Sequence, residues 1–319
     1  MSFSSEIKEE LIGRIPAARH CQIAELAALT IFLGKIKKQE GASGFSVEIE
    51  TENRQIAKKY ATLLKQTFSI KGSVFVPEEP TGKRAGAILL SIDRAEETQK
   101  LLQAMKLLDD AHDLMEREYL VSRRIVQNTC CKRAFIRGAF LAAGSMSSPE
   151  RSYHFEIVCQ TEKKAEQLKE LINDFGLDSK ITQRKKYYIV YLKEGSQIAD
   201  ILRVMEASVS IMNFENVRIL KEMRNSVNRQ VNCETANINK TVHAAVKQLE
   251  DIQYIQKKTG LETLPENLYQ MAMLRLQYPE APLKELGMLL NPTVGKSGVN
   301  HRLRKLSKIA EELREEEKK

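Results

Sequence analysis

Residues 21–34 (CQIAELAALTIFLG) and residues 131–144 (CKRAFIRGAFLAAG) are two stretches of similar sequence within one chain. Both are apolar, rich in small residues and closed by a glycine. When the chain is compared with itself at an offset of 110 residues, positions 21–60 match at eight places, including Cys21/Cys131 and Gly34/Gly144. Chance would give about two or three matches in a window of that length. The sequence therefore predicts an internal duplication.

The composition predicts a globular protein that binds an acidic partner. The chain has 319 residues, enough for two or three domains, with 42% hydrophobic and 29% charged residues. No apolar run approaches the ~20 residues that cross a bilayer, and the polar N-terminus does not resemble a signal peptide, so we expect a cytoplasmic protein and no membrane partner. The net charge of +8 favours nucleic acid as the partner.

The five cysteines are an odd number without a C-x-x-C pair, which argues against a disulfide framework and for a reducing compartment. Tandem Cys130 and Cys131 could form a thiol pair, but their place at the head of an apolar helix favours buried packing. His301 has no His or Cys partner at helical spacing. We therefore predict neither a metal nor a cofactor.

Hydrophobic periodicity predicts the same order of elements in both copies. The first copy has helices at residues 21–34, 53–68 and 96–108, and strands at 45–50, 71–76 and 87–92. The second has helices at 131–144, 162–175 and 196–205, and strands at 153–160, 180–183 and 187–192. The resulting division is an N-terminal helix (1–20), a first repeat (21–108), a connecting segment predicted to be helical (109–130), a second repeat (131–205), a linker (206–240) and a C-terminal domain (241–319).

The C-terminal domain carries the strongest functional pattern. A short amphipathic helix (283–290) is followed by a break at residues 291–295 and by a basic helix that we expect Ser297 to cap, within a motif of about residues 282–314. Leu303, Leu306 and Ile309, with Val299 one turn earlier, mark its buried face. This order is typical of a helix-turn-helix, in which Arg and Asn read bases while Lys holds phosphates. The predicted DNA-binding residues are Lys296, Ser297, Asn300, His301, Arg302, Arg304, Lys305 and Lys308.

The alternative for this region is a solvated basic face on an ordinary helical hairpin. Five Lys or Arg and no acid lie between residues 296 and 308, and this favours DNA. Under that interpretation, Arg302→Ala or Asn300→Ala is expected to weaken specific binding by about 1–3 kcal/mol. For the asparagine-rich residues 232–239 in the linker, we expect a hydrogen-bonded loop that does not read bases.

The two apolar stretches resemble the LAGLIDADG motif of homing endonucleases. Aligned on the final glycine, the copies read LAALTIFLG (residues 26–34) and IRGAFLAAG (residues 136–144). In that family the two motif helices pack side by side, and the acid before each glycine binds the catalytic metal. Leu33 and Ala143 occupy those positions here, and neither supplies the oxygen ligand that Mg²⁺ needs. Glu40 and Glu150 lie outside the motif, so we predict that the chain is not an enzyme.

The whole chain resembles the WhiA family of bacterial sporulation and cell-division regulators, most clearly at SFSSEIKEEL near the start, at NRQVNCETANINKTVHAA (228–245) and at residues 283–306. The resemblance implies an α+β fold: a duplicated LAGLIDADG-like α/β repeat with saddle-shaped antiparallel sheets, followed by an all-α helix-turn-helix domain like the promoter-reading domain of sigma factors. It implies a nucleoid-associated protein that binds double-stranded DNA, with links to transcription, division and chromosome segregation. RNA polymerase or a sigma factor is a further candidate partner.

Other basic residues are candidates for accessory DNA contacts. They are Lys83 and Arg84 in the last hairpin of the first repeat, Arg184, Lys185 and Lys186 in the matching hairpin, and Arg218 and Arg224 in the linker. A solvated turn is the simpler explanation for such hairpin tips. A second interpretation of the whole chain stays open: an adaptor whose N-terminal domain binds a transcription or division protein, with DNA contact only supportive.

Overall fold

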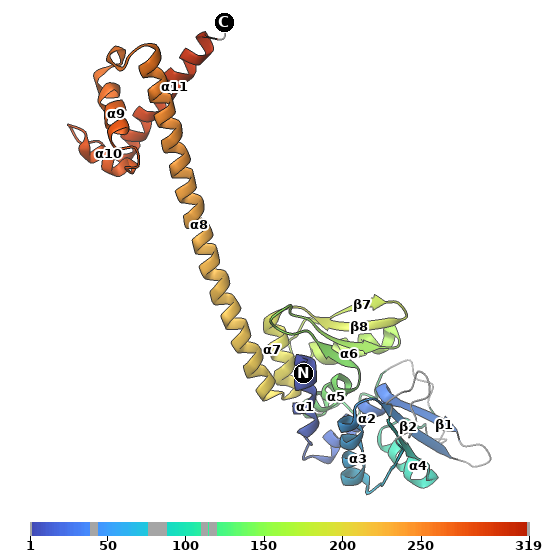
Figure 1. The fold of residues 1–319 in the computed structure, drawn as a ribbon. Coiled ribbons are helices and arrows are strands. Elements are labelled where there is room, and N and C mark those ends of the chain that lie inside the picture. Colours follow the sequence, from blue (N-terminus) through green and yellow to red (C-terminus); the bar gives the residue numbers. More distant parts are fainter. Residues whose placement is uncertain (1, 39–43, 76–87, 110–113, 115–119, 318–319) are drawn as a thin grey trace. The chain divides into compact units, whose positions relative to one another are not determined.

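The computed structural model describes residues 2–38, 44–75, 88–109, 114 and 120–317 (Figure 1). These residues form two compact units, Met1–Lys221 and Glu222–Lys319. The fold matches the predicted class, because the first unit combines helices with antiparallel sheets and the second is helical. No described helix has the length and hydropathy of a membrane span.

The first unit contains the predicted duplication. After α1 (Phe3–Gly13), the first copy runs through α2 (Arg19–Leu33), β1 (Gly34–Lys38), β2 (Phe45–Thr51), α3 (Arg54–Phe68), β3 (Ser73–Phe75), β4 (Ile88–Ile92) and α4 (Ala95–Ala104). The second runs through α5 (Thr129–Ala143), β5 (Gly144–Met146), β6 (Phe155–Cys159), α6 (Glu162–Asn173), β7 (Lys180–Arg184), β8 (Tyr187–Leu192) and α7 (Gly195–Met205). The strand orders, β1-β2-β4-β3 and β5-β6-β8-β7, are the same topology twice.

Each sheet buries one face, as the period-two pattern predicts. In β2, Phe45, Val47 and Ile49 are buried, and the side chains between them are half-exposed. Strand β6 repeats the pattern with Phe155 and Ile157. The buried faces join the paired helices in one hydrophobic core, so both repeats share a single interior.

Helices α2 and α5 pack against each other at the centre of this unit, and a glycine sets their separation. A Cβ atom at Gly138 would lie 2.8 Å from the Ala28 Cβ and 2.8 Å from the Glu25 carbonyl oxygen. No side chain fits there without moving a backbone. The small residues of the two stretches therefore permit the close helix contact that the LAGLIDADG resemblance implies.

Several local predictions were wrong. The glycine that closes each apolar helix also begins an unpredicted strand, since Gly34 pairs with Ile49 and Gly144 pairs with Ile157. The cap of α1 is Ser2, whose hydroxyl accepts the Ser5 N–H. Residues 120–128 form bends and turns where a helix was expected. The rest of that segment lies largely outside the described residues.

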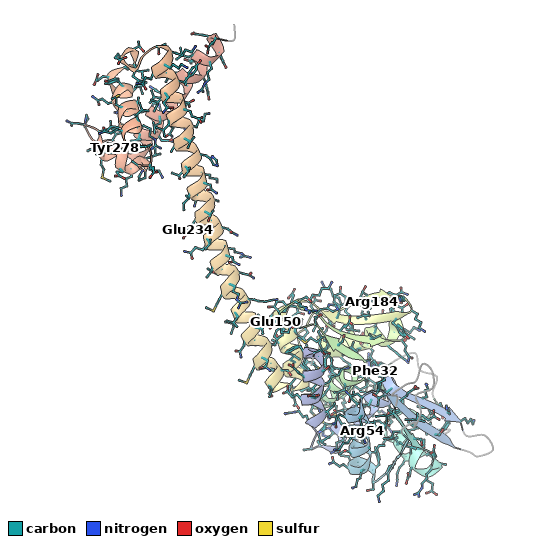
Figure 2. The ribbon with its side chains drawn as sticks, in the orientation of Figure 1. Phe32, Arg54, Glu150, Arg184, Glu234 and Tyr278 are labelled. Carbon is teal, nitrogen blue, oxygen red and sulfur yellow. The ribbon has the colours of Figure 1, made fainter. Side chains whose placement is uncertain are left out.

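Helix α8 (Ser208–Lys258) covers the predicted linker. The loop expected at residues 232–239 is instead helical and exposed. Hydrogen bonds between residues four apart run along its surface, from the Gln230 amide to the Glu234 carboxylate (3.0 Å) and from the Thr241 hydroxyl to the Asn237 carbonyl (2.9 Å). Figure 2 shows Glu234 on this helix.

The second unit is built from the end of α8, a short 3-10 helix (Leu261–Thr263), α9 (Glu266–Gln277), α10 (Leu283–Leu289) and α11 (Lys296–Glu316). Its core is separate from that of the first unit and draws on all four α-helices. The buried apolar side chains are Ile252, Ile255, Leu261, Leu268, Met271, Ala272, Leu286, Leu290, Val299, Leu303, Leu306 and Ala310.

Candidate nucleic-acid interface

Helix α11 has one buried stripe and one basic exposed face. Val299, Leu303 and Leu306 are at most 1% exposed and pack into the core of the second unit. At about 100° per residue, the opposite side of the helix carries a second set of residues within an arc of roughly 100°. That set, here named the α11 face, consists of Ser297, His301, Arg304, Lys305 and Lys308, and all five are exposed.

The turn before α11 is held by a close backbone contact. The Val294 N–H donates to the Gly287 carbonyl oxygen at 2.9 Å, which joins the turn to α10. A Cβ atom at Gly287 would lie 2.0 Å from the Val294 carbonyl oxygen, so only glycine fits. The short α10, the turn of residues 290–295 and α11 thus form the helix-turn-helix unit that the sequence predicts.

The start of α11 differs from the prediction in one respect. The cap is Gly295, with no side-chain hydrogen bond, and its carbonyl oxygen accepts the Val299 N–H at 3.1 Å. The expected Ser297 cap is therefore wrong. Because Ser297 lies in the first turn of the helix and is exposed, its hydroxyl belongs to the α11 face.

The cations of the α11 face have few anionic neighbours. Within the described part of the chain, neither Arg304 nor Lys305 forms an ion pair, and Lys308 has only the weak i,i+4 contact to Glu312 at 3.6 Å. Exposed pairs of that kind contribute little. Lys296 is also exposed, just before this face. The face therefore presents its positive charge to solvent.

Two other predicted residues lie beside the face. Asn300 and Arg302 are half-buried. The Arg302 Nη1 group donates to the Asn267 carbonyl oxygen at 3.5 Å, next to the start of α9. The predicted DNA-binding residues thus divide into an exposed group of six and the half-buried pair Asn300 and Arg302.

The far end of α11 is tied to the end of α8. The Arg314 guanidinium donates to the buried Asp251 carboxylate at 2.7 Å and lies 4.8 Å from the centre of the Tyr254 ring. The Tyr254 hydroxyl in turn donates to Glu317 at 2.6 Å, and this hydrogen bond raises the pKa of Tyr254. Since these contacts lie beyond the α11 face, they orient the helix without occupying its basic residues.

Only some of the predicted accessory residues can be placed. Lys83 and Arg84 lie outside the described residues. Arg184, Lys185 and Lys186 are exposed at the β7–β8 hairpin, where Figure 2 labels Arg184, which pairs with Glu156 at 3.8 Å.

On α8, Arg218 is half-buried and pairs with Glu215 at 2.7 Å, while Arg224 is exposed. Arg184, Lys185, Lys186 and Arg218 belong to the first unit, and neither they nor Arg224 lie on α11. We therefore build the candidate interface from α11.

The motif positions of the first unit carry apolar side chains. Leu33 and Ala143 are the last residues of α2 and α5, and both are half-buried against the core. Of the acidic pair noted in the sequence, Glu40 lies outside the described residues, while Glu150 is exposed in the loop before β6. The ends of the paired helices therefore offer no carboxylate at the two positions that bind metal in homing endonucleases.

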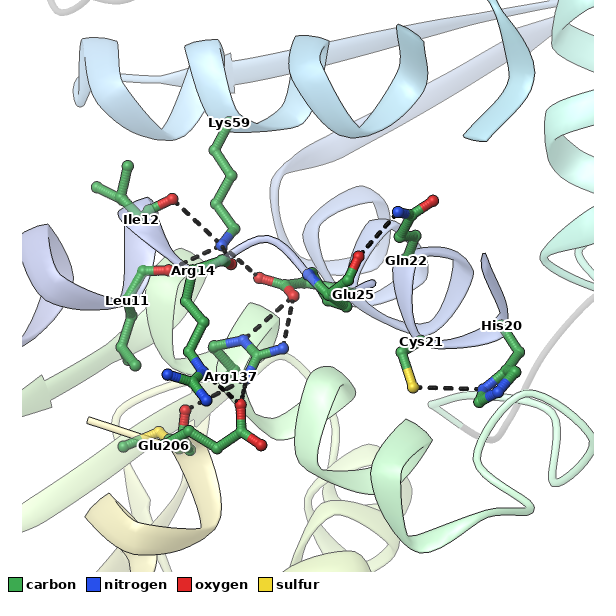
Figure 3. A network of polar contacts seen from close by, with 12 residues as sticks. Leu11, Ile12, Arg14, His20, Cys21, Gln22, Glu25, Lys59, Arg137 and Glu206 are labelled. Carbon is green, nitrogen blue, oxygen red and sulfur yellow. Dashed lines mark hydrogen bonds and ion pairs between the residues drawn. The ribbon is translucent and has the colours of Figure 1, made fainter. Parts of the chain in front are cut away.

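A buried ionic network crosses between the repeats near the middle of the paired helices (Figure 3). The Glu25 carboxylate of α2 faces the Lys59 ammonium of α3 at 2.8 Å and the Arg137 guanidinium of α5 at 3.0 Å. Arg137 also donates to Glu206 at 3.0 Å. Sequence periodicity did not indicate this network, because its members come from separate elements.

Comparison with known proteins agrees with this architecture. Residues 19–108 match the model of the WhiA N-terminal LAGLIDADG-like domain, residues 132–224 the WhiA LAGLIDADG-like domain, and residues 227–310 the WhiA C-terminal HTH domain. A probable cell division protein WhiA of Lachnoclostridium phytofermentans is 54% identical, covering 99% of this chain and all of that protein. A probable cell division protein WhiA of Alkaliphilus oremlandii is 46% identical, over 99% of this chain and 98% of the length of that protein.

Among solved structures, full-length DUF199/WhiA from Thermatoga maritima matches with a TM-score of 0.60. The alignment covers 98% of this chain and 99% of that one, at 24% sequence identity. At this level of identity the likeness establishes the fold.

Proposed function

This chain belongs to the WhiA family, and we propose that it is a sequence-specific DNA-binding regulator whose α11 face reads the double helix. The names of its relatives support a role in cell division. The proposal extends to regulation of transcription during division, chromosome segregation or sporulation, at the nucleoid in the cytoplasm. RNA polymerase or a sigma factor would then be a second partner at the promoter.

The observation that carries the proposal is the α11 face itself. A helix enters the major groove only if one side is free of the protein core, and this side lies opposite Val299, Leu303 and Leu306. Guanidinium groups pair with guanine O6 and N7, and ammonium groups neutralise phosphates. We assign base reading to Arg304, with Asn300 and Arg302 at the edge of the groove, and phosphate contacts to Lys296, Lys305 and Lys308.

The sheets of the first unit support a lesser role in DNA binding. Their outer residues pair across strands, with Lys35 at 2.6 Å from Glu50 and Lys37 at 2.7 Å from Glu48. A surface on which cations and carboxylates alternate attracts phosphates less than one that carries cations alone. The exposed Arg184, Lys185 and Lys186 would contact DNA phosphates, which adds affinity without selecting a base sequence.

Cleavage of the bound DNA is not part of the proposal. The apolar Leu33 and Ala143 side chains cannot hold the hard cation that a LAGLIDADG nuclease uses. The paired helices of the first unit would then serve as a scaffold. The protein would bind its site and leave both strands intact.

The test begins with selection of bound fragments from sheared DNA of the source genome by the full chain, which supplies a specific duplex. Fluorescence anisotropy then gives Kd for that duplex and for a scrambled one. Arg304→Ala should weaken specific binding by about 1–3 kcal/mol, roughly 5- to 150-fold, and should relax preference at one base pair. Lys305→Ala should weaken binding to the specific and the scrambled duplex by the same factor. It should also reduce the slope of log K against log salt concentration by about 1.

The matched control is Lys257→Ala, which removes an exposed lysine of the same unit from α8. It should leave the preference for the specific duplex unchanged. Specific binding that survives Arg304→Ala, Arg302→Ala and Asn300→Ala together would contradict the assignment of α11. So would specific binding by a chain that lacks residues 260–319.

A further inference from the structure

Four side chains with metal-binding atoms meet at the N-terminal ends of the two central helices. His20 and Cys21 lie in the first turn of α2, and Cys130 and Cys131 lie in the first turn of α5. One nitrogen or sulfur atom from each residue lies within 4.8 Å of all the others. Figure 3 shows His20 and Cys21 at this end of α2. The duplication brings them together, because Cys21 and Cys131 are equivalent positions of the two repeats.

The nitrogen–sulfur distances within the cluster are close to those of a zinc coordination sphere. The His20 Nδ1 atom lies 3.1 Å from the Cys131 Sγ, 3.3 Å from the Cys21 Sγ and 4.0 Å from the Cys130 Sγ. A tetrahedral zinc ion with Zn–S bonds of about 2.3 Å and Zn–N bonds of about 2.0 Å separates its nitrogen and sulfur ligands by about 3.5 Å. The three observed distances lie on both sides of that value. Small movements of the side chains would place all four atoms around one ion.

We propose that His20, Cys21, Cys130 and Cys131 bind one zinc ion. Three thiolates and one imidazole are a ligand set that zinc takes in structural sites, whereas Mg²⁺ and Ca²⁺ require oxygen ligands. Four protein ligands complete the tetrahedron, so no position remains for a substrate or an attacking water. The site is therefore structural.

The surroundings of the cluster suit a thiolate-bound ion. His20 and Cys21 lie at the N-terminus of α2, and Cys130 and Cys131 lie at the N-terminus of α5, where the helix dipole favours negative charge. Zinc with three thiolates carries a net negative charge. The cavity of about 720 Å³ beside the cluster is lined by Cys21 and Cys130 together with three arginines and two glutamates, a net positive set: Arg14, Arg133, Arg137, Glu10 and Glu206. His20 and Cys130 are exposed, which gives an ion a path to the site.

The position of the site separates it from nuclease chemistry. Leu33 and Ala143, where a LAGLIDADG nuclease would hold its metal, lie at the opposite ends of the same helices. Fifteen residues of helix at about 1.5 Å each place the two ends about 20 Å apart. A zinc ion at the N-terminal ends would link the two repeats, because it would take two ligands from each.

A packing cluster without metal is the simpler alternative, and it explains Cys21 and Cys131, which are buried. Hydrogen bonds between the His20 Nδ1 atom and the Cys131 and Cys21 thiols would also hold the histidine in such a cluster without a metal. A disulfide is the second alternative. The packing cluster and the disulfide each predict results that differ from those expected for a zinc site in the following experiment.

The experiment uses the full chain, purified under reducing conditions without a polyhistidine tag. Elemental analysis should find about one zinc ion per chain. Replacement with Co²⁺ should give the visible absorption of a tetrahedral thiolate site. His20→Ala and Cys130→Ser, both at exposed positions, should each weaken zinc binding by about tenfold or more, since even outer-shell changes cost that much. Cys233→Ser, an exposed cysteine on α8, should have no effect.

Thiol titration and intact mass distinguish the remaining outcomes. Zinc should protect three thiols from alkylation until a chelator removes it, and the chelator should lower the melting temperature of the first unit. A reduced protein that binds no zinc when the ion is supplied would overturn the proposal. A mass lower by the two hydrogens of a disulfide, with no zinc taken up after reduction, would overturn it in favour of a redox pair. Neither result depends on DNA binding.

Discussion

Glu25→Gln is the substitution that tests most directly how the two repeats are held together. Glu25 is fully buried and faces two cations, Lys59 at 2.8 Å and Arg137 at 3.0 Å. The Lys59 ammonium also donates to the backbone carbonyls of Leu11 (2.7 Å) and Arg14 (2.5 Å), so it cannot leave without breaking the α1 contact. Glutamine keeps the shape of the side chain and removes only its charge. Both cations would then be buried without a counter-charge on α2.

The expected loss follows from that burial. Removing one partner of a buried ion pair costs about 3–5 kcal/mol, because the other charge stays desolvated. Here one carboxylate serves two cations, and Arg137 keeps a second partner in Glu206 at 3.0 Å. We therefore expect a loss of about 4 kcal/mol from the free energy of unfolding of the first unit. A domain with a typical stability of about 5–15 kcal/mol would remain folded, with a much lower melting temperature.

The loss should depend on pH in a defined direction. Burial lowers the pKa of Lys59, the Glu25 charge raises it, and the Arg137 charge lowers it again. Without Glu25 the pKa of Lys59 falls further below that of the unfolded chain. The unfolded state then binds more protons than the folded state between those two pKa values, so stability rises with pH. The difference in free energy of unfolding between the unsubstituted chain and Glu25→Gln should therefore shrink as the pH is raised from 7 toward 10.

Urea unfolding of the full chain, followed by far-UV circular dichroism and tyrosine fluorescence, measures the effect, since the chain has nine tyrosines and no tryptophan. Hydrogen exchange assigns each transition to one of the two units. Asp200→Asn, which breaks an exposed pair with Arg203, is the control and should cost at most about 1 kcal/mol. A loss below about 1 kcal/mol for Glu25→Gln, or a deficit that does not change with pH, would refute the argument.

Three further predictions concern other parts of the molecule. Gly287→Ala should destabilise the second unit by about 1–3 kcal/mol in thermal unfolding, because its Cβ would meet a backbone oxygen at 2.0 Å, while Gly295→Ala, in open space, should cost at most about 1 kcal/mol. Burial raises the pKa of Glu206, but the Arg14 hydrogen bond and the Arg137 charge outweigh it and lower the pKa below the ordinary 4.5. The ionised Glu206 carboxylate should thus stabilise the first unit fully above about pH 4.5, and this stabilisation should decline as the pH falls further. Glu206→Gln should remove this part of the acid sensitivity, which equilibrium unfolding at several pH values would measure. Supercoiled plasmid carrying the selected DNA site should remain uncut in Mg²⁺ or Mn²⁺, and specific cutting would contradict the argument from the two apolar motif positions.

The sequence alone determined the repeat, most of the helices and strands within it, and the candidate helix of the C-terminal unit. Alternation in residues 45–50 and the spacing of Val299, Leu303 and Leu306 report burial directly, because each regular element exposes and buries residues at its own period. The same reasoning failed at residues 232–239. Asparagine disfavours helix by well under 1 kcal/mol per residue, so its density is a weak signal within a continuous 51-residue helix.

Only the tertiary structure decided which distant residues meet. Cys21 and Cys131, or Glu25 and Arg137, are separated by 110 or more residues, and no spacing within one helix could pair them. They become neighbours because α2 and α5 approach closely at Gly138. Spacing within one helix could not indicate the cluster of His20, Cys21, Cys130 and Cys131, because its residues come from two helices. Periodicity shows which face of an element is buried, whereas packing alone determines what that face meets.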